Sequence, residues 1–344
     1  MEATTTVSKN DIDAFLEELL EEYEVFAPIK QDDVVSFGSI SSAAEVVLDV
    51  FNTLEPPKSV LFPQSEPIFT YALSDGVAGI WVPLRQERPR VVFGVRPCDA
   101  RSFSILDRVF GGEKYQDVYY LNRRANTTVV TIGCNEPRST CFCTSVGGGP
   151  FSTEGTDLLL VDVGDEYAIR IITDKGARLL KAKSIKGATK EQRALIRRIA
   201  RNAEASMVDT LPVNKLKEKL DNIFYDPAWK DLTEKCLGCG VCTYLCPTCH
   251  CFDIVDEATD SGINRIRLWD SCQFSQFTLQ TSGFNPRTST KERLRQRIMH
   301  KFSYFPENYG QFGCVGCGRC VTECPANVDI REIIKSVQKQ KVAI

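Results

Sequence analysis

Histidine is almost absent from this sequence of 344 residues, in which only His250 and His300 occur. This scarcity excludes a metal site built mainly from imidazole ligands. Cysteine, by contrast, occurs 15 times. An odd count of this size in a reducing compartment argues against a disulfide framework. Ligation of metal by thiolates is the better interpretation, and it favours Fe–S clusters or zinc.

Long hydrophobic runs are lacking as well. No stretch approaches the ~20 apolar residues of a membrane span, and residues 1–10 lack the basic-then-apolar layout of a signal peptide. The net charge is only −3, so no excess of one sign favours nucleic acid or an anionic membrane. These absences predict a soluble, cytoplasmic protein that neither binds nucleic acid nor inserts into a membrane.

Nucleotide- and flavin-binding fingerprints are missing too. Gly147–Gly149 is not followed by the Lys-Ser/Thr pair of a phosphate loop, and no G-x-G-x-x-G segment joins a strand to a helix. The triple glycine is interpreted as a turn. No nucleophile–base pair is evident, and neither histidine has a catalytic setting. The sequence therefore indicates a conductor of electrons rather than a catalyst, and no catalytic residue is assigned.

The cysteines are distributed unevenly along the chain. None precedes Cys98, four lie from Cys98 to Cys143, and the remaining ones lie from Cys236 to Cys324. This distribution predicts two domains, at 1–228 and 229–344, with Asp226-Pro227 at the junction.

The first domain alternates strand and helix patterns. Runs rich in β-branched residues predict strands at 91–95, 128–132, 158–163 and 167–172. Apolar residues at helical spacing predict helices at 12–23, 99–110, 190–205 and 213–224. This domain is therefore α/β or α+β. The second domain is expected to be mainly helical apart from its cysteine loops, with helices at 290–302 and 330–339.

One cysteine motif occurs twice in the second domain. The pattern C-x2-C-x2-C-x3-C-P runs from Cys236 to Pro247 and again from Cys314 to Pro325. Bacterial two-cluster ferredoxins use this run, and the fourth cysteine of each run ligates the other cluster. One [4Fe–4S] cluster is therefore predicted on Cys236, Cys239, Cys242 and Cys324, and a second on Cys314, Cys317, Cys320 and Cys246. Two zinc sites or unliganded thiols are the alternatives.

Residues 247–313 form a long insert between the two motifs. Cys246-Pro-Thr-Cys249-His250 spells the C-x-x-C-H of haem attachment, but haem would take Cys246 from its cluster. The insert also carries a basic stretch, which we interpret as a solvated helix face; a docking surface for an acidic partner is the alternative. The stretch comprises Lys291, Arg293, Arg295, Arg297 and Lys301.

Four more cysteines follow the strands of the first domain. Cys98 comes just after the strand expected at 91–95, and Cys134 just after the one at 128–132. If those strands are neighbours, both thiols lie at one edge of the sheet, with Cys141 and Cys143 on a short loop beside them. Four such thiols predict a third [4Fe–4S] cluster, with zinc or free redox-active thiols as alternatives. Cys249, Cys251 and Cys272 are interpreted as buried thiols near the clusters, or as a further metal or partner-shared site.

With these residues assembled, the sequence resembles the beta subunits of cytoplasmic sulfhydrogenases (sulfur-reducing NiFe hydrogenases) and the corresponding iron–sulfur subunits of anaerobic sulfite reductases. The resemblance runs from about residue 91 to the end and includes the second cluster motif. Its other marks are Arg-Pro-Cys98-Asp-Ala, Gly-Cys134, Thr-Cys141-Phe-Cys143, Cys246-Pro-Thr-Cys249-His-Cys251-Phe and Trp269-Asp-Ser-Cys272.

This resemblance implies a protein that relays electrons between a flavin subunit, which handles NAD(P)H, and a catalytic subunit. The catalytic subunit would be a hydrogenase, a sulfite reductase or a heterodisulfide reductase-like module. Family members share the group of Cys98, Cys134, Cys141 and Cys143, which supports the third cluster. Two alternatives remain: a self-sufficient oxidoreductase whose first domain binds a substrate or flavin, and a structural metal-binding module without a redox role.

Overall fold

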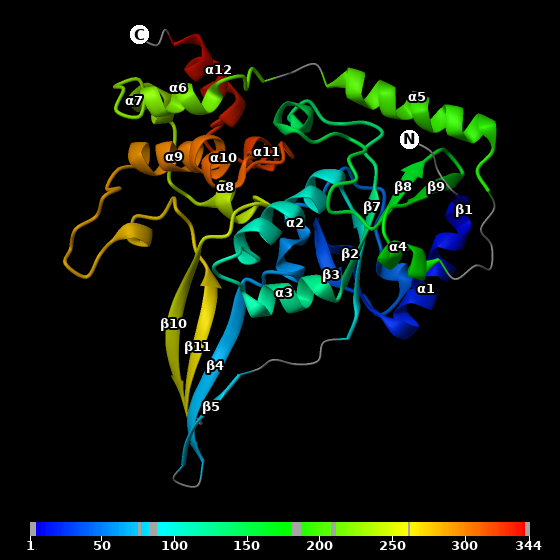
Figure 1. Ribbon diagram of the computed structural model, residues 1–344, viewed down its shortest axis with the longest axis horizontal. Coiled ribbons are helices and arrows are strands. Elements are labelled where there is room, and N and C mark those ends of the chain that lie inside the picture. Colours follow the sequence, from blue (N-terminus) through cyan, green and yellow to red (C-terminus); the bar gives the residue numbers. More distant parts are fainter. Residues whose placement is uncertain are drawn as a thin grey trace.

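The computed structural model describes residues 5–74, 77–82, 88–180, 187–207, 211–260 and 262–340. Within these ranges the chain forms a large sheet of seven strands, a cap of short helices and a four-stranded arm that projects from the body (Figure 1). The strands of the large sheet are β1 (Thr5–Ser8), β2 (Glu24–Gln31), β3 (Val34–Ser39), β6 (Arg90–Val95), β7 (Thr127–Ile132), β8 (Leu158–Asp162) and β9 (Glu166–Ile171).

The large sheet has the strand order β1-β9-β8-β7-β6-β2-β3. Its central strands β2, β6, β7 and β8 run parallel, whereas the pairs β1–β9, β8–β9 and β2–β3 are antiparallel. Because both faces of a parallel centre are covered, its strands are continuous apolar or β-branched runs. β7 follows this rule, since all six of its residues are buried.

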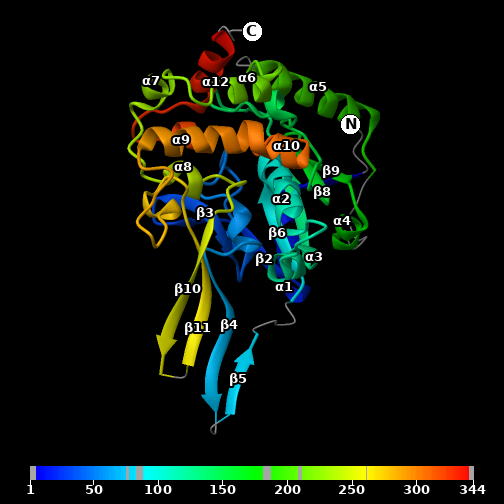
Figure 2. The same cartoon turned by 60° about the vertical axis from the view of Figure 1, so that its left-hand side comes forward.

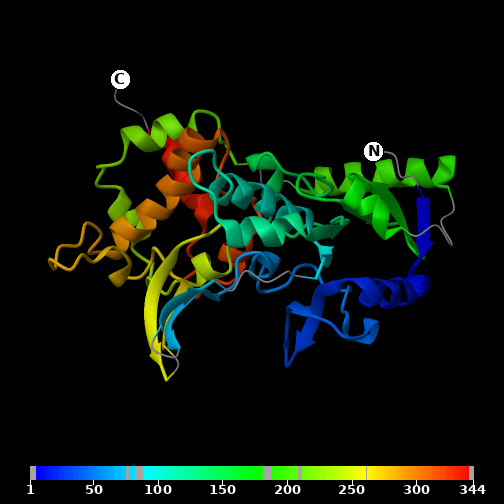
Figure 3. The same cartoon turned by 60° about the horizontal axis from the view of Figure 1, so that its bottom comes forward.

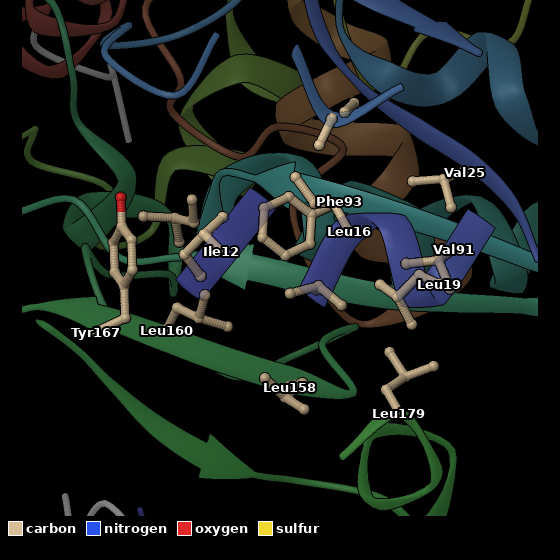
Figure 4. Packing of buried hydrophobic residues seen from close by; sticks show 14 of the residues in the cluster. Ile12, Leu16, Leu19, Val25, Val91, Phe93, Leu158, Leu160, Tyr167 and Leu179 are labelled. Atoms are coloured by element: carbon tan, nitrogen blue, oxygen red, sulfur yellow. The ribbon is translucent and has the colours of Figure 1, made fainter. Parts of the chain in front are cut away.

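Helices cover both faces of the sheet. On one face α1 (Ile12–Glu22) packs Leu16 and Leu19 against Val91 and Phe93 of β6 (Figure 4). On the other face α2 (Pro97–Phe110) and α3 (Val118–Ala125) cover Val92 and Val95. Side chains on a strand alternate between faces, so β6 contributes to two separate cores. The large sheet is therefore a rigid base for whatever follows β6 and β7.

The cap of helices surrounds the cysteines of the C-terminal part. α6 (Leu216–Asn222), α9 (Thr290–Met299) and α12 (Ile330–Lys339) share a core that also takes in Phe142 and Val146 from the N-terminal part. α9 continues through a π-helical turn, η6 (His300–Tyr304), into α10 (Phe305–Tyr309). This continuous rod lies across α2 in Figure 2. The cap and the sheet are thus packed together rather than joined by a linker.

The arm joins strands from distant parts of the sequence. Its order is β10-β11-β4-β5, and β11 pairs with β4 in an antiparallel register that sets Ile263 opposite Tyr71. Figure 3 shows the arm well away from α1. The strands of the arm are β4 (Ser65–Ser74), β5 (Val77–Trp81), β10 (Phe252–Thr259) and β11 (Gly262–Trp269).

The remaining elements are short, apart from one long helix. They are α4 (Asp174–Leu179), α5 (Lys190–Ser206), α7 (Trp229–Thr233), α8 (Val241–Tyr244), α11 (Arg319–Thr322), η1 (Lys9–Asp11), η2 (Ala43–Glu45), η3 (Pro57–Val60), η4 (Cys143–Val146) and η5 (Gln276–Thr278).

The expected mixed α/β first part is confirmed, and each strand and helix predicted there has a counterpart. The second part is less helical than expected, because β10 and β11 lie inside the insert at 247–313. The division at residue 228 stays a prediction; the pairing of β11 with β4 runs across it. No helix in the described ranges is both long and apolar enough to span a bilayer.

Candidate metal centres

Cysteine side chains line three neighbouring cavities in the described part of the chain. The first, which we call the first-motif cavity, is lined by Cys236, Cys239, Cys242 and Cys324. Cys239 is exposed, whereas the other three are half-buried. Residues of α9 and α12 form an apolar wall behind them. These are the four cysteines predicted for one cluster, including Cys324 from the second motif.

Glycine turns give the two motifs the same loop shape. Gly238 and Gly316 have φ angles of +68° and +67°, and Gly240 and Gly318 have +81° and +79°. Positive φ is accessible to glycine at little cost. The turn lets the backbone N–H of Gly316 donate to the Cys314 Sγ at 3.4 Å. Such N–H donors stabilise sulfur that carries negative charge.

The second-motif cavity is lined by Cys246, Cys314, Cys317 and Cys320. These are the cysteines predicted for the second cluster, and Cys246 comes from the first motif. Cys246 and Cys314 are buried, whereas Cys317 and Cys320 are half-buried. The fold therefore exchanges the fourth cysteines between the two loops, as the ferredoxin pattern requires. The ligation itself stays a prediction.

The N-terminal cavity is lined by Cys98, Cys134, Cys141 and Cys143. Because β6 and β7 are parallel neighbours, the residues that follow them meet at one edge of the sheet. Cys98 lies in the first turn of α2, directly after β6. Thus the structure brings together the four cysteines that were predicted for a third cluster.

The loop that carries Cys141 and Cys143 packs directly on the second motif. The Phe142 N–H donates to the Gly316 carbonyl at 2.9 Å. A Cβ atom on Gly316 would lie 2.5 Å from the Cys143 backbone nitrogen. Only glycine permits this approach. The N-terminal cysteines and the second motif therefore form one packed unit.

Shared walls connect the three cavities in a fixed order. Cys320 lines both the first-motif and the second-motif cavity, and Cys317 lines both the second-motif and the N-terminal cavity. The second-motif cavity is therefore in the middle. The side chains of single cysteines lie between neighbouring cavities.

A buried ion pair fixes the middle of this series to the sheet. The Arg319 guanidinium on α11 donates to both carboxylate oxygens of Asp99 on α2, at 2.6 and 2.7 Å. Its Nε donates to the Thr53 carbonyl at 2.9 Å. Removing one partner of such a pair costs about 3–5 kcal/mol, because the other charge is left buried. Arg319 follows Cys317 closely, so the pair positions this motif.

The donor set fits [4Fe–4S] clusters. Each cavity offers four thiols around open space, and thiolate is the ligand such clusters use. Nowhere in the described ranges do three or more His, Cys, Asp or Glu side chains converge so as to hold one metal ion directly. The thiols instead surround room for a larger body.

Burial keeps most of these thiols protonated when no metal is bound. It raises the pKa of Cys314 to about 11 and the pKa values of Cys143, Cys317 and Cys320 to about 12. Each thiol must lose its proton to become a ligand. In the metal-free fold a raised thiol pKa contributes stability that is complete below the ordinary value of 9.0 and is lost as pH rises through 11 to 12. Iron binding has the opposite sign and is favoured by rising pH.

Reconstitution with iron and sulfide is therefore expected to be more complete at about pH 8.5 than at about pH 6.5, because fewer protons compete with iron at the higher pH. The measurement is iron per chain after removal of excess reagent, with proton release followed by an indicator dye. Far-UV circular dichroism at both pH values is the control for the fold. Equal iron content and no proton release would contradict the prediction.

Cys249, Cys251 and Cys272 line none of the three cavities. Cys249 and Cys272 are buried, which agrees with the first interpretation. A hydrogen bond from the Cys251 thiol lowers the pKa of Cys272 to about 6. The imidazole of His250 lies 5.5 Å from that of His300, and burial lowers their pKa values to about 4 and about 3. Both rings are therefore neutral near neutral pH.

The basic stretch at residues 291–301 is not a solvated face, and this interpretation was wrong. Arg293, Arg297 and Lys301 are only 8%, 3% and 3% exposed. They repeat every four residues, so they share one side of the helical rod, and that side faces the cysteines. The alternative of a docking surface fails for the same three residues. Composition alone gave no sign of this, because charges on a helix are usually solvated.

Comparison with known proteins extends the pattern beyond the motifs. A family model described as a 4Fe-4S dicluster domain matches residues 235–328, a range that contains both motifs. Over 328 residues the chain is 30% identical to the protein named Sulfhydrogenase 2 subunit beta of Pyrococcus furiosus. That alignment covers 94% of this chain and 95% of the relative. No solved structure gave a significant match.

Proposed function

The chain belongs to the family of sulfhydrogenase beta subunits, and from this membership we propose that it relays electrons between a flavin subunit that handles NAD(P)H and a redox catalytic subunit. Family and dicluster domain together identify an iron–sulfur electron-transfer subunit of an oxidoreductase. For the catalytic subunit we propose a hydrogenase, a sulfite reductase or a heterodisulfide reductase-like module.

The order of the cavities is the observation that carries this proposal. [4Fe–4S] clusters, when bound, accept and release single electrons. Cys317 and Cys320 each border two cavities, so neighbouring redox sites are separated by little more than a side chain. We assign the ligands as Cys236, Cys239, Cys242 and Cys324; Cys246, Cys314, Cys317 and Cys320; and, for a third cluster, Cys98, Cys134, Cys141 and Cys143.

Both ends of the series reach the surface, as a relay requires. At one end Cys239 is exposed, and Leu237 beside it is 68% exposed. At the other end the N-terminal cavity shares Phe51 and Asn52 with an open polar cleft of about 530 Å³. A buried middle with two exposed ends suits a protein that contacts one redox partner at each end.

The polar cleft favours one other function. Its size lies within the ~300–1,000 Å³ of small-molecule sites, and Arg138 and Arg319 are among its lining residues. A self-sufficient oxidoreductase that binds a substrate or flavin there is therefore the second candidate. The isolated chain would then retain flavin or reduce a dye with NAD(P)H. The relay proposal expects neither from the chain alone.

Metal analysis tests the relay proposal. Protein prepared without oxygen is expected to hold about eight iron and eight sulfide per chain from the two motifs, and about twelve of each if the N-terminal set is filled. Electron paramagnetic resonance after reduction should show coupled signals of neighbouring clusters. Iron near about four per chain, or stoichiometric zinc, would contradict the proposal.

A further inference from the structure

The helical rod formed by α9, η6 and α10 carries a stripe of buried cations, which we call the cationic stripe: Arg293, Arg297 and Lys301. Arg297 lines both the first-motif and the second-motif cavity, whereas Lys301 lines only the second. The Nη2 atom of Arg293 would lie 3.5 Å from a Cβ atom on Gly238, within the first motif. The stripe therefore runs along the cysteine-lined cavities from one to the next.

Lys301 makes the closest contact with a predicted ligand. Its Nζ donates to the Cys246 Sγ at 3.2 Å, to the Thr248 Oγ1 at 2.9 Å and to the Gly313 carbonyl at 2.8 Å. It lies in the π-helical turn His300–Tyr304. Such turns are rare and are frequent at functional sites. All three donors of the ammonium group are thus used, and one of them reaches sulfur.

Arg297 lies one helical turn earlier and binds the same region. Its Nη1 donates to the Cys249 Sγ at 3.2 Å, and its Nη2 donates to the Cys242 carbonyl at 2.6 Å. Among the described residues no carboxylate forms an ion pair with Arg297 or Lys301. Burying a charge without an anion costs several kcal/mol. The anions available to these two cations are the cysteine thiolates around the cavities.

We propose that Lys301, supported by Arg297, sets the reduction potential of the cluster held by Cys246, Cys314, Cys317 and Cys320. Reduction adds one negative charge to that cluster, and a fixed cation in a poorly solvated site stabilises the added charge. Lys301 thus makes the middle site of the relay easier to reduce. The inference rests on the proposed function, because it requires the cluster to be present and redox-active.

The test is a redox titration of the full-length protein by electron paramagnetic resonance. In Lys301→Gln the ratio of reduced to oxidised cluster at a fixed potential is expected to fall about tenfold for one cluster, a shift of ~59 mV for one electron. The shift is toward more negative potential. Lys301→Arg keeps the charge and should keep most of the potential. Lys291→Gln is the matched control, because this lysine lies on the same helix with a 43% exposed side chain.

Iron content separates the outcomes. If Lys301→Gln keeps the iron of the wild-type protein and every cluster keeps its potential, the inference is overturned while the relay stands. If the wild-type protein has no reducible cluster, the proposed function fails first. If Lys301→Gln loses iron, Arg297→Gln decides: a shift to more negative potential supports the inference, and an unchanged potential overturns it.

Discussion

Cys246→Ala is expected to remove about four iron per chain and to destroy the cluster of the second motif rather than that of the first. Cys246 follows Cys242 closely in the sequence, yet its side chain lines the cavity of Cys314, Cys317 and Cys320. A cluster that loses one of four thiolates keeps an open iron site and is prone to loss. Iron and sulfide per chain are the measurement.

Double variants show which cluster is lost. If Cys246 and Cys314 bind the same cluster, Cys246→Ala/Cys314→Ala should lose no more iron than either single variant, because effects within one unit are not additive. Cys246→Ala/Cys239→Ala should lose about eight, two clusters' worth. Cys249→Ala is the matched control, since Cys249 is a buried neighbour that lines none of the three cavities. Additive loss in the first double variant would show that the exchange of fourth cysteines does not occur.

The strands of the large sheet could be predicted because their environment is uniform. β6 and β7 are covered on both faces, so burial alone selects their apolar and β-branched residues. The arm offered no such pattern. In β10 seven of the eight residues are exposed, so no period-2 alternation marks it as a strand. Its neighbour β11 also pairs with β4, whose residues lie far away in the sequence.

The cysteine sites were predictable to different degrees. The doubled motif carries its own loop geometry, including glycines with matching φ angles, and spacing was therefore enough to group Cys236 to Cys246 and Cys314 to Cys324. The N-terminal set needed a tertiary fact, the parallel pairing of β6 and β7. The roles of Arg319 and Lys301 could not be predicted, because their partners Asp99 and Cys246 come from distant segments.

Cys141→Ser is expected to remove about four further iron per chain while the two motif clusters keep their signals. Cys141 is half-buried and lines only the N-terminal cavity of the three. Serine keeps nearly the same volume, so the loop should retain its packing, including the bond from the Phe142 N–H to the Gly316 carbonyl. A hydroxyl oxygen is a harder ligand than a thiolate and suits an iron–sulfur cluster poorly. The loss should therefore be chemical rather than structural.

The full-length chain is the proper material for this test, because the Cys141 loop packs on the second motif. Iron and sulfide per chain are measured beside the electron paramagnetic resonance signals of the reduced protein. Cys251→Ser is the matched control, since Cys251 is also half-buried but lines none of the cavities. Wild-type iron near about eight, unchanged in Cys141→Ser, would mean that the four N-terminal thiols are free. They would then be protonated at neutral pH, since burial raises the pKa of Cys134 to about 11 and that of Cys143 to about 12, and the relay would end at the second-motif cavity.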